Sequence, residues 1–164
     1  MEIIIKPLNN RFAEQAIRLI LNIQQNEFNI PITIEDQPDL RSIESAYFAA
    51  GGHFWGAFCA GELVGTIGLI KFDTHSGAIR KMFVKSDFRG KAFGVGQRLL
   101  DTLMAYCHNA GIDRLYLGTV STLQAAKRFY ERNQFAIIEK DSLPSKFPVM
   151  GADDTFYARK LTKV

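Results

Sequence analysis

The feature that most restricts the fold is a run of three apolar segments joined by short turns. Residues 53–60 and 62–72 are rich in β-branched and aromatic residues, with a tight turn at Ala60-Gly61 between them. A second turn at 73–77 leads into a third segment at 78–84. Because such short turns join strands that lie side by side, the pattern predicts three neighbouring antiparallel strands.

The residues before this run predict one strand and two helices. A strand is expected at 3–6, followed by Pro7 and by Asn9 or Asn10 as the cap of a helix. Apolar residues in that helix recur at three- and four-residue spacing: Phe12, Ala16, Leu19, Ile20 and Ile23. Residues 28–39 carry two prolines and predict a loop, and a second helix is expected at 39–50 before two glycines.

The residues after the run predict two helices and three strands. Apolar residues at every fourth position indicate an amphipathic helix that ends at Gly111: Val95, Leu99, Leu103 and Cys107. Next we expect a strand at 114–119 and a helix that begins at Ser121 or Thr122 and ends at Arg132. Two more strands are expected at 135–139 and 155–161, with a loop at 141–151 between them. No repeat or linker appears, so we expect residues 1–164 to form one domain. The fold class is α+β: a mixed, mostly antiparallel sheet of six to seven strands with helices on both faces.

Composition excludes several classes of function. The 164 residues are 47% apolar and 23% charged, with a net charge of +3, as in an ordinary globular protein. No apolar run approaches the roughly 18 residues of a membrane span. No dense basic run suggests nucleic-acid binding, and the three histidines and two cysteines lack metal-ligand spacing. We therefore expect a cytoplasmic protein without membrane, nucleic-acid or metal partners.

Residues 82–100 carry the strongest functional signal, a strand that leads through a basic, glycine-bearing turn into a helix. The N-terminus of a helix offers unpaired N–H groups and partial positive charge to a phosphate. Gly94 and Gly96 permit close approach of a ligand, and Arg89 and Lys91 add charge. The dinucleotide pattern fails at Leu99. The P-loop pattern fails because Gln97-Arg98 follows Gly96, while a glycine that merely begins a helix remains an alternative.

Two motifs resemble the GNAT superfamily of acyl-CoA-dependent N-acetyltransferases. The sequence Lys91-Ala92-Phe93-Gly94-Val95-Gly96 is similar to the family's [QR]-x-x-G-x-[GA] signature, with Lys in the first place. The preceding residues 84–90 match the usual strand, turn and aromatic-Arg-Gly triplet. Residues 126–135 resemble the second motif, A-x-x-F-Y-E-x-x-G-F. The order of elements agrees over nearly the whole chain.

The resemblance implies a cofactor, acetyl-CoA, and a set of residues that bind it. In this family the strand before the glycine turn splays from the next one, and pantetheine lies in the gap. The implied pantetheine contacts are backbone groups of Met82, Phe83 and Val84, and the pyrophosphate would be held from Ala92 to Gln97. The full expected set is Met82, Phe83, Val84, Arg89, Gly90, Lys91, Ala92, Phe93, Gly94, Val95, Gly96 and Gln97. Tyr130 occupies the family's usual position for the acid that protonates the departing thiolate.

The chain departs from the family pattern at three positions. Ala78 stands where many relatives carry the glutamate that acts as general base, so that carboxylate is missing. Glu27, His75 and Asp141 are candidates by residue type alone, and water is another, so no base is assigned. Leu123 replaces an Asn that contacts pantetheine, and Gln134 replaces a Gly, so the turn there must avoid positive φ or tolerate strain. We expect residues 27–50 and 141–154 to form the acceptor pocket.

The sequence thus predicts direct transfer of acetyl from acetyl-CoA to a primary amine of a small molecule, amino acid or peptide. An alternative is a non-catalytic acyl-CoA-binding sensor, motivated by Ala78, and a weaker one is a generic interaction domain. Retention of Tyr130 favours catalysis, because a sensor needs no acid. The acceptor, the use of a longer acyl group, and assembly as a homodimer stay open.

Overall fold

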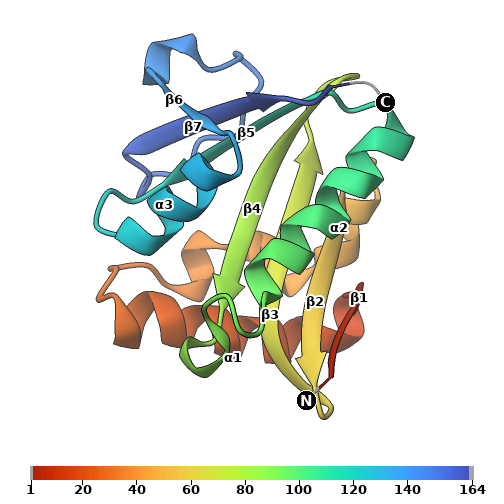
Figure 1. The fold of residues 1–164 in the computed structure, drawn as a ribbon, viewed down its shortest axis with the longest axis vertical. Coiled ribbons are helices and arrows are strands. Elements are labelled where there is room, and N and C mark those ends of the chain that lie inside the picture. Colours follow the sequence, from red (N-terminus) through yellow and green to blue (C-terminus); the bar gives the residue numbers. More distant parts are fainter. Residues whose placement is uncertain (1, 163–164) are drawn as a thin grey trace.

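A seven-stranded sheet with helices on both faces makes up the chain, of which the computed structural model describes residues 2–162 (Figure 1). The strand order is β1-β2-β3-β4-β5-β7-β6. The strands are β1 (Ile3–Pro7), β2 (His53–Cys59), β3 (Glu62–Lys71), β4 (Ser76–Val84), β5 (Arg114–Thr119), β6 (Ala136–Ile138) and β7 (Thr155–Lys160). The α-helices of this range are α1 (Ala13–Leu21), α2 (Val95–Ala110) and α3 (Gln124–Arg132). The predicted α+β class is confirmed.

The parallel pair β4 and β5 separates soon after it forms. Residues 76–78 of β4 pair with residues 114–116 of β5, and every other pair of neighbouring strands is antiparallel. Beyond this short ladder, β4 continues to Val84 and β5 to Thr119 without pairing to each other. Figure 1 shows the two strands diverging, with α2 and α3 in front of the sheet, α2 to the right of β4 and α3 to its left. The splay leaves a length of β4 backbone with a free edge in the middle of the sheet.

A β-bulge in β4 marks the start of this free edge. The pairing with β3 shifts by one residue between Gly68↔Arg80 and Thr66↔Phe83, and Lys81 between them has a φ of 55°. The Thr66 hydroxyl donates to the Lys81 carbonyl at 2.7 Å, which holds the extra residue in place. A bulge bends and twists its strand, so this one contributes to the divergence of β4 from β5.

Each face of the sheet carries its own core. On one face, α2 buries Leu99, Leu100, Leu103 and Cys107 completely against the strands, as its four-residue repeat predicts. On the other, Ala16 and Ile20 of α1 pack with a second cluster that contains Leu40, Ile43, Tyr47, Phe54 and Phe58. The helices on both faces and the tight turn at Ala60-Gly61, where φ is 50° and 81°, match the predictions.

The second predicted helix, at 39–50, is wrong. A 3₁₀ helix (Pro38–Arg41) and a π-helix (Glu44–Phe48) replace it, separated at Ser42, whose φ and ψ of −147° and 76° are not helical. The break allows both Leu40 and Ile43 to be fully buried. The first predicted helix is longer than α1, because it continues after Leu21 as a π-helix (Asn22–Glu27). The third strand of the initial run begins at Ser76, earlier than expected, because 76–78 also pair with β5.

Two predictions around α3 are corrected or resolved. Neither Ser121 nor Thr122 caps the helix: Leu123 is the cap residue, without a side-chain hydrogen bond. The Ser121 backbone N–H and hydroxyl instead donate to the Asp154 carboxylate at 2.8 and 3.0 Å. Gln134, in place of the family's glycine, takes a φ of 68°, so the turn keeps its left-handed conformation and tolerates the strain.

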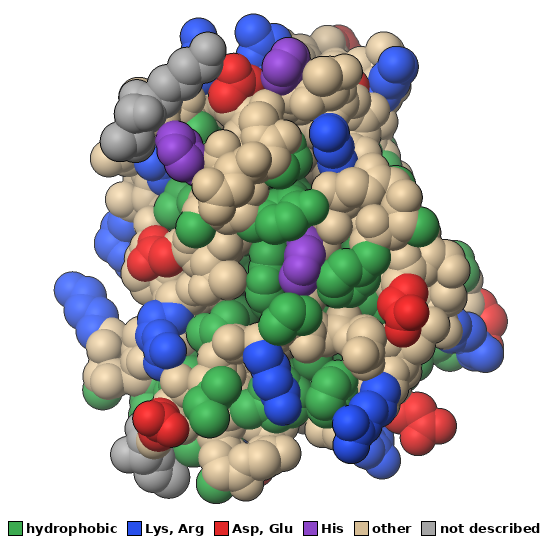
Figure 2. Space-filling model, turned by 90° about the vertical axis from the view of Figure 1, so that its right-hand side faces the viewer, with side chains coloured by type: hydrophobic (Ala, Val, Ile, Leu, Met, Phe, Trp, Pro, Cys, Tyr) green, Lys and Arg blue, Asp and Glu red, His purple; other side chains and the backbone are tan. Residues whose placement is uncertain are grey.

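Charged side chains of both signs are spread over the face that is on the right in Figure 1 and toward the viewer in Figure 2. Figure 2 shows hydrophobic side chains between them, with no concentration of Lys and Arg. Within residues 2–162, no helix is long and apolar enough to cross a membrane. The same range contains no group of three or more His, Cys, Asp and Glu side chains that could hold a metal ion.

Candidate active site

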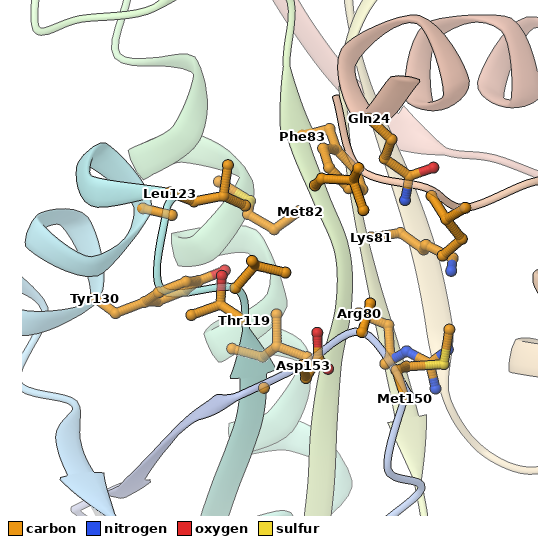
Figure 3. Close-up of a pocket in the computed structure, with 17 residues that line it drawn as sticks. Gln24, Arg80, Lys81, Met82, Phe83, Thr119, Leu123, Tyr130, Met150 and Asp153 are labelled. Carbon is orange, nitrogen blue, oxygen red and sulfur yellow. The ribbon is translucent and has the colours of Figure 1, made fainter. Parts of the chain in front are cut away.

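A cavity of about 120 Å³ lies where β4 and β5 diverge (Figure 3). Its lining comes from β4, from the end of β5, from α3, and from two segments distant in sequence. Those two segments contribute Gln24, Ile30 and Ile32 from the N-terminal part, and Met150, Ala152 and Asp153 from the residues before β7. Residues from both segments that were expected to form the acceptor pocket therefore line one cavity.

Tyr130 places its hydroxyl at this cavity. The ring is packed against Phe129, Phe135 and Tyr157, with centroids 5.5, 5.6 and 6.2 Å away. The residue is 5% exposed, and within residues 2–162 its hydroxyl has no hydrogen-bond partner. Figure 3 shows the oxygen pointing from α3 into the gap. Burial raises the pKa of Tyr130 well above its usual value, so the hydroxyl keeps its proton throughout the physiological range.

The glycine turn before α2 depends on left-handed backbone. Gly90 has a φ of 100° and Gly94 one of 60°, and Gly94 caps α2 without any side-chain hydrogen bond. Gly96 serves a different purpose: a Cβ there would lie 3.2 Å from Cε of Met82 and 3.6 Å from Cε1 of Phe129. The absence of a side chain at Gly96 brings the first turn of α2 close to both β4 and α3.

Three of the four cations near this turn already have protein partners. Lys85 pairs with Glu62, and Arg98 donates to the Ile3 carbonyl at 2.7 Å. Arg89 forms a two-pronged ion pair with Glu27 and donates from Nε to the Val84 carbonyl at 2.8 Å. Lys91 is exposed and has no such partner among the described residues. Arg89 thus holds the turn against the N-terminal segment. Of these four cations, Lys91 is the one whose ammonium has no partner among the described residues.

The other predicted cofactor residues lie around the same turn. Val95 is buried, and the Phe93 ring packs on Phe88 at 5.3 Å, so these two fix the turn onto the core. The Gln97 amide donates to Asp101 and to Asn133, each at 2.9 Å, and so ties α2 to the end of α3. Ala92 is exposed beside Lys91.

None of the residues considered as a general base lines the cavity. Ala78 is fully buried in an apolar cluster with Phe147 and Phe156. Glu27 is paired with Arg89, and the His75 ring nitrogen Nδ1 lies 3.0 Å from the Gly111 carbonyl. Asp141 is exposed in a 3₁₀ turn (Lys140–Ser142).

A carboxylate that sequence reasoning missed, Asp153, does line it. The side chain lies directly over Gly118 of β5, where an added Cβ would be 2.6 Å from Oδ2 of Asp153. Burial raises the pKa of Asp153 to about 6, against the opposing charges of Arg80 and Lys81. The neighbouring Asp154 holds the segment in place through Ser121. No motif marks Asp153, because only the pairing of β7 with β5 brings it to the gap.

A buried polar network forms one wall beside Asp153. Gln24 and Gln37 exchange side-chain hydrogen bonds of 3.1 and 2.9 Å, and Lys81 Nζ donates to Gln37 Oε1 at 2.8 Å. Asp39 lies 3.7 Å from Lys81 Nζ and accepts from the Tyr47 hydroxyl at 2.5 Å. Burial lowers the pKa of Lys81 to about 8. These contacts connect the β4 bulge to the N-terminal segments and occupy the Lys81 ammonium.

Comparison with known proteins identifies the class of this fold and site. The model of the acetyltransferase (GNAT) family matches residues 17–135, and the chain belongs to that family. A GNAT-family acetyltransferase from Staphylococcus aureus MU50 is 42% identical over 98% of this chain and 100% of its own, with a TM-score of 0.95. An acetyltransferase from Streptococcus agalactiae 2603 is 27% identical over 97% and 98%, with a TM-score of 0.92.

More distant structures share the fold. PaiA N-acetyltransferase from Thermoplasma acidophilum, solved in complex with coenzyme A, has a TM-score of 0.75 at 19% identity, over 98% of this chain and 99% of its own. A comparison with curated protein sequences gives no match. The resemblance read from the two motifs is therefore confirmed at the level of family and fold.

Proposed function

We propose that this protein transfers an acetyl group from acetyl-CoA to a primary amine of a small molecule, amino acid or peptide, by direct attack. The observation that carries the proposal is the gap between β4 and β5. The Tyr130 hydroxyl, which has no hydrogen-bond partner among the described residues, faces this gap, and a glycine turn leads into α2 beside it. This combination provides a place for a thioester, a proton donor beside it, and N–H groups for phosphates.

The residues present fit coenzyme A. Beyond the short ladder with β5, the backbone of Met82, Phe83 and Val84 has a free edge that can pair with the pantetheine amides as an added strand would. The N–H groups from Ala92 to Gln97, with Gly90 and Gly94 in left-handed conformation, would hold the pyrophosphate. Lys91 adds a free charge, whereas Arg89 would act by holding the turn.

Two side chains supply the proton transfers of the proposed reaction. Acetyl-CoA, when bound, supplies the thioester carbon that the amine nitrogen attacks as the carbon–sulfur bond breaks. Asp153, ionised above about pH 6, would accept the proton that the amine must lose. Tyr130, kept protonated by burial, would donate to the departing sulfur as negative charge develops on it. In this assignment Asp153 replaces the carboxylate that is absent at Ala78, although it lies on a different element.

Calorimetry with acetyl-CoA, followed by thiol release across a panel of primary amines, tests the proposal. We expect binding and turnover of at least one amine. Binding without turnover on any amine would instead favour the non-catalytic sensor. Absence of binding at millimolar acetyl-CoA would exclude both the enzyme and the sensor.

A further inference from the structure

Arg80 lines the cavity, and its positively charged guanidinium has few hydrogen-bond acceptors around it. The residue lies on β4 next to the bulge, is half-buried, and donates from Nη2 to the sulfur of Met150 at 2.8 Å. A thioether is a weak acceptor, and a guanidinium carries five N–H donors. Within residues 2–162, no carboxylate lies within 4.0 Å of its nitrogen atoms. By contrast, Arg89 has a carboxylate and Arg98 a carbonyl as partner.

Asp153 brings a negative charge to the same cavity, and it too lacks a partner. In the described part of the chain its carboxylate accepts no hydrogen bond and forms no ion pair. Arg80 is near enough for its charge to lower the pKa of Asp153, yet the two side chains do not pair within 4.0 Å. Figure 3 shows Arg80 pointing from β4 toward Met150, and Asp153 on the segment that crosses beside β4 before β7.

The other charged groups around the cavity are accounted for. Lys81 is held by Gln37 and Asp39, and Asp154 by Ser121. The remaining lining is largely apolar or uncharged, including Tyr130, Ile30, Ile32 and Ala152. Two residues of opposite charge therefore line one small cavity without forming an ion pair with each other.

We propose that Asp153 and Arg80 form the acceptor subsite, and that the acceptor is a small zwitterion. Asp153 receives its amine and Arg80 a carboxylate on the same molecule. The inference rests on the acetyl transfer proposed above and names its substrate class. A carboxylate can accept two parallel hydrogen bonds from a guanidinium, which is the strongest pairing open to Arg80. A simple amine would leave Arg80 bonded to sulfur, and a polyamine would bring further cations against Arg80 and Lys81.

The test compares acceptors that differ in the carboxylate alone. Thiol release from acetyl-CoA is measured with the common amino acids, with their carboxamides, and with the corresponding decarboxylated amines. We expect kcat/KM for the preferred amino acid to exceed that of its amide by about tenfold or more, the scale of one charge-assisted hydrogen bond. The amine of the amide is less basic and more often neutral, so its protonation cannot explain a lower rate.

Variants assign the preference to Arg80. In Arg80→Met, the values of kcat/KM for amino acid and amide should come together, mainly through a higher KM for the amino acid. Arg80→Lys, which keeps the charge without the planar fork, should retain part of the preference. Arg18→Met, at an exposed position of α1, is the matched control and should keep all of it. Calorimetry with acetyl-CoA confirms that each variant is folded.

The outcomes separate this inference from the proposed function. Equal use of an amino acid and its amide by the unchanged protein, or a preference that survives Arg80→Met, would overturn the zwitterion subsite while acetyl transfer stands. A preference for polyamines would overturn it in the same way. Absence of thiol release with every amine would overturn both.

Discussion

Replacing Gly94 should damage cofactor binding more than it damages the fold. Gly94 caps α2 with a φ of 60° and ψ of 24°, and a Cβ built there meets nothing within 4 Å. The cost of Gly94→Ala is therefore conformational rather than steric, about 1–2 kcal/mol for a left-handed L-residue. Gly94→Val should cost more, because its β-branch restricts the backbone further, and Gly94→Asn less, because Asn tolerates this region.

Gly111 provides a matched control at the other end of the same helix. Its φ is 74°, and an added Cβ there also meets nothing within 4 Å. Gly111→Ala should therefore lower the free energy of unfolding by a similar amount, about 1–2 kcal/mol, without changing the affinity for acetyl-CoA. At Gly94 the conformational strain can instead be relieved if the turn opens. An open turn would raise the Kd for acetyl-CoA about 5- to 30-fold.

Urea denaturation and calorimetry on the same samples measure both quantities. The combined loss of stability and of acetyl-CoA affinity should increase from Gly94→Asn through Gly94→Ala to Gly94→Val. Two results would refute this expectation. One is a Gly94→Val protein with unchanged stability and unchanged Kd, and the other is an equal loss of acetyl-CoA affinity in Gly111→Ala.

Variants at three further positions, with Asp141→Asn as a control, test the roles assigned around the gap. Tyr130→Phe should lower kcat about 100-fold or more while the Kd for acetyl-CoA stays the same; unchanged turnover would remove Tyr130 from its role. In the unchanged protein, kcat/KM should rise with pH through about 6, because Asp153 is protonated and inactive below that pH. Asp153→Asn should lose this limb together with most activity, whereas exposed Asp141→Asn should retain both, and a persistent limb in Asp153→Asn would assign it to another group. Lys91→Ala should raise the Kd for acetyl-CoA about two- to fivefold at low salt, with a smaller effect at high salt, and a salt-independent change would argue against a phosphate contact.

Much of the fold could be read from the sequence because local signals agreed with the global arrangement. The four-residue repeat of α2 gave its buried face, and the tight turn at Ala60-Gly61 fixed the pairing of β2 with β3. The regions that were misread are those where tertiary packing decides. Ser42 breaks a helix so that Leu40 and Ile43 can both be buried, and local propensity does not report such a requirement.

The candidate site likewise contains some residues that local sequence signals reveal and others that only tertiary structure brings together. The glycine turn and Tyr130 lie in contiguous motifs, so they could be found without a structure. Arg80 comes from β4 and Asp153 from the segment before β7, and no spacing relates them. The bulge at Lys81 likewise leaves no signature in the sequence, although it alters which β4 residues face the cavity. Residues that meet only through sheet topology need coordinates to be recognised.

The ion pair between Arg89 and Glu27 joins parts of the molecule that would handle different substrates. Arg89 belongs to the turn beside α2, and Glu27 ends the π-helix from which Gln24 reaches the cavity between β4 and β5. Movement of the turn when phosphates bind would therefore be transmitted to the cavity wall. Kinetically, this coupling predicts ordered addition, with acetyl-CoA before the amine, and Glu27→Gln should weaken the order. Product-inhibition patterns distinguish this sequence from random addition, and a random mechanism in the unchanged protein would mean that the two sites respond independently.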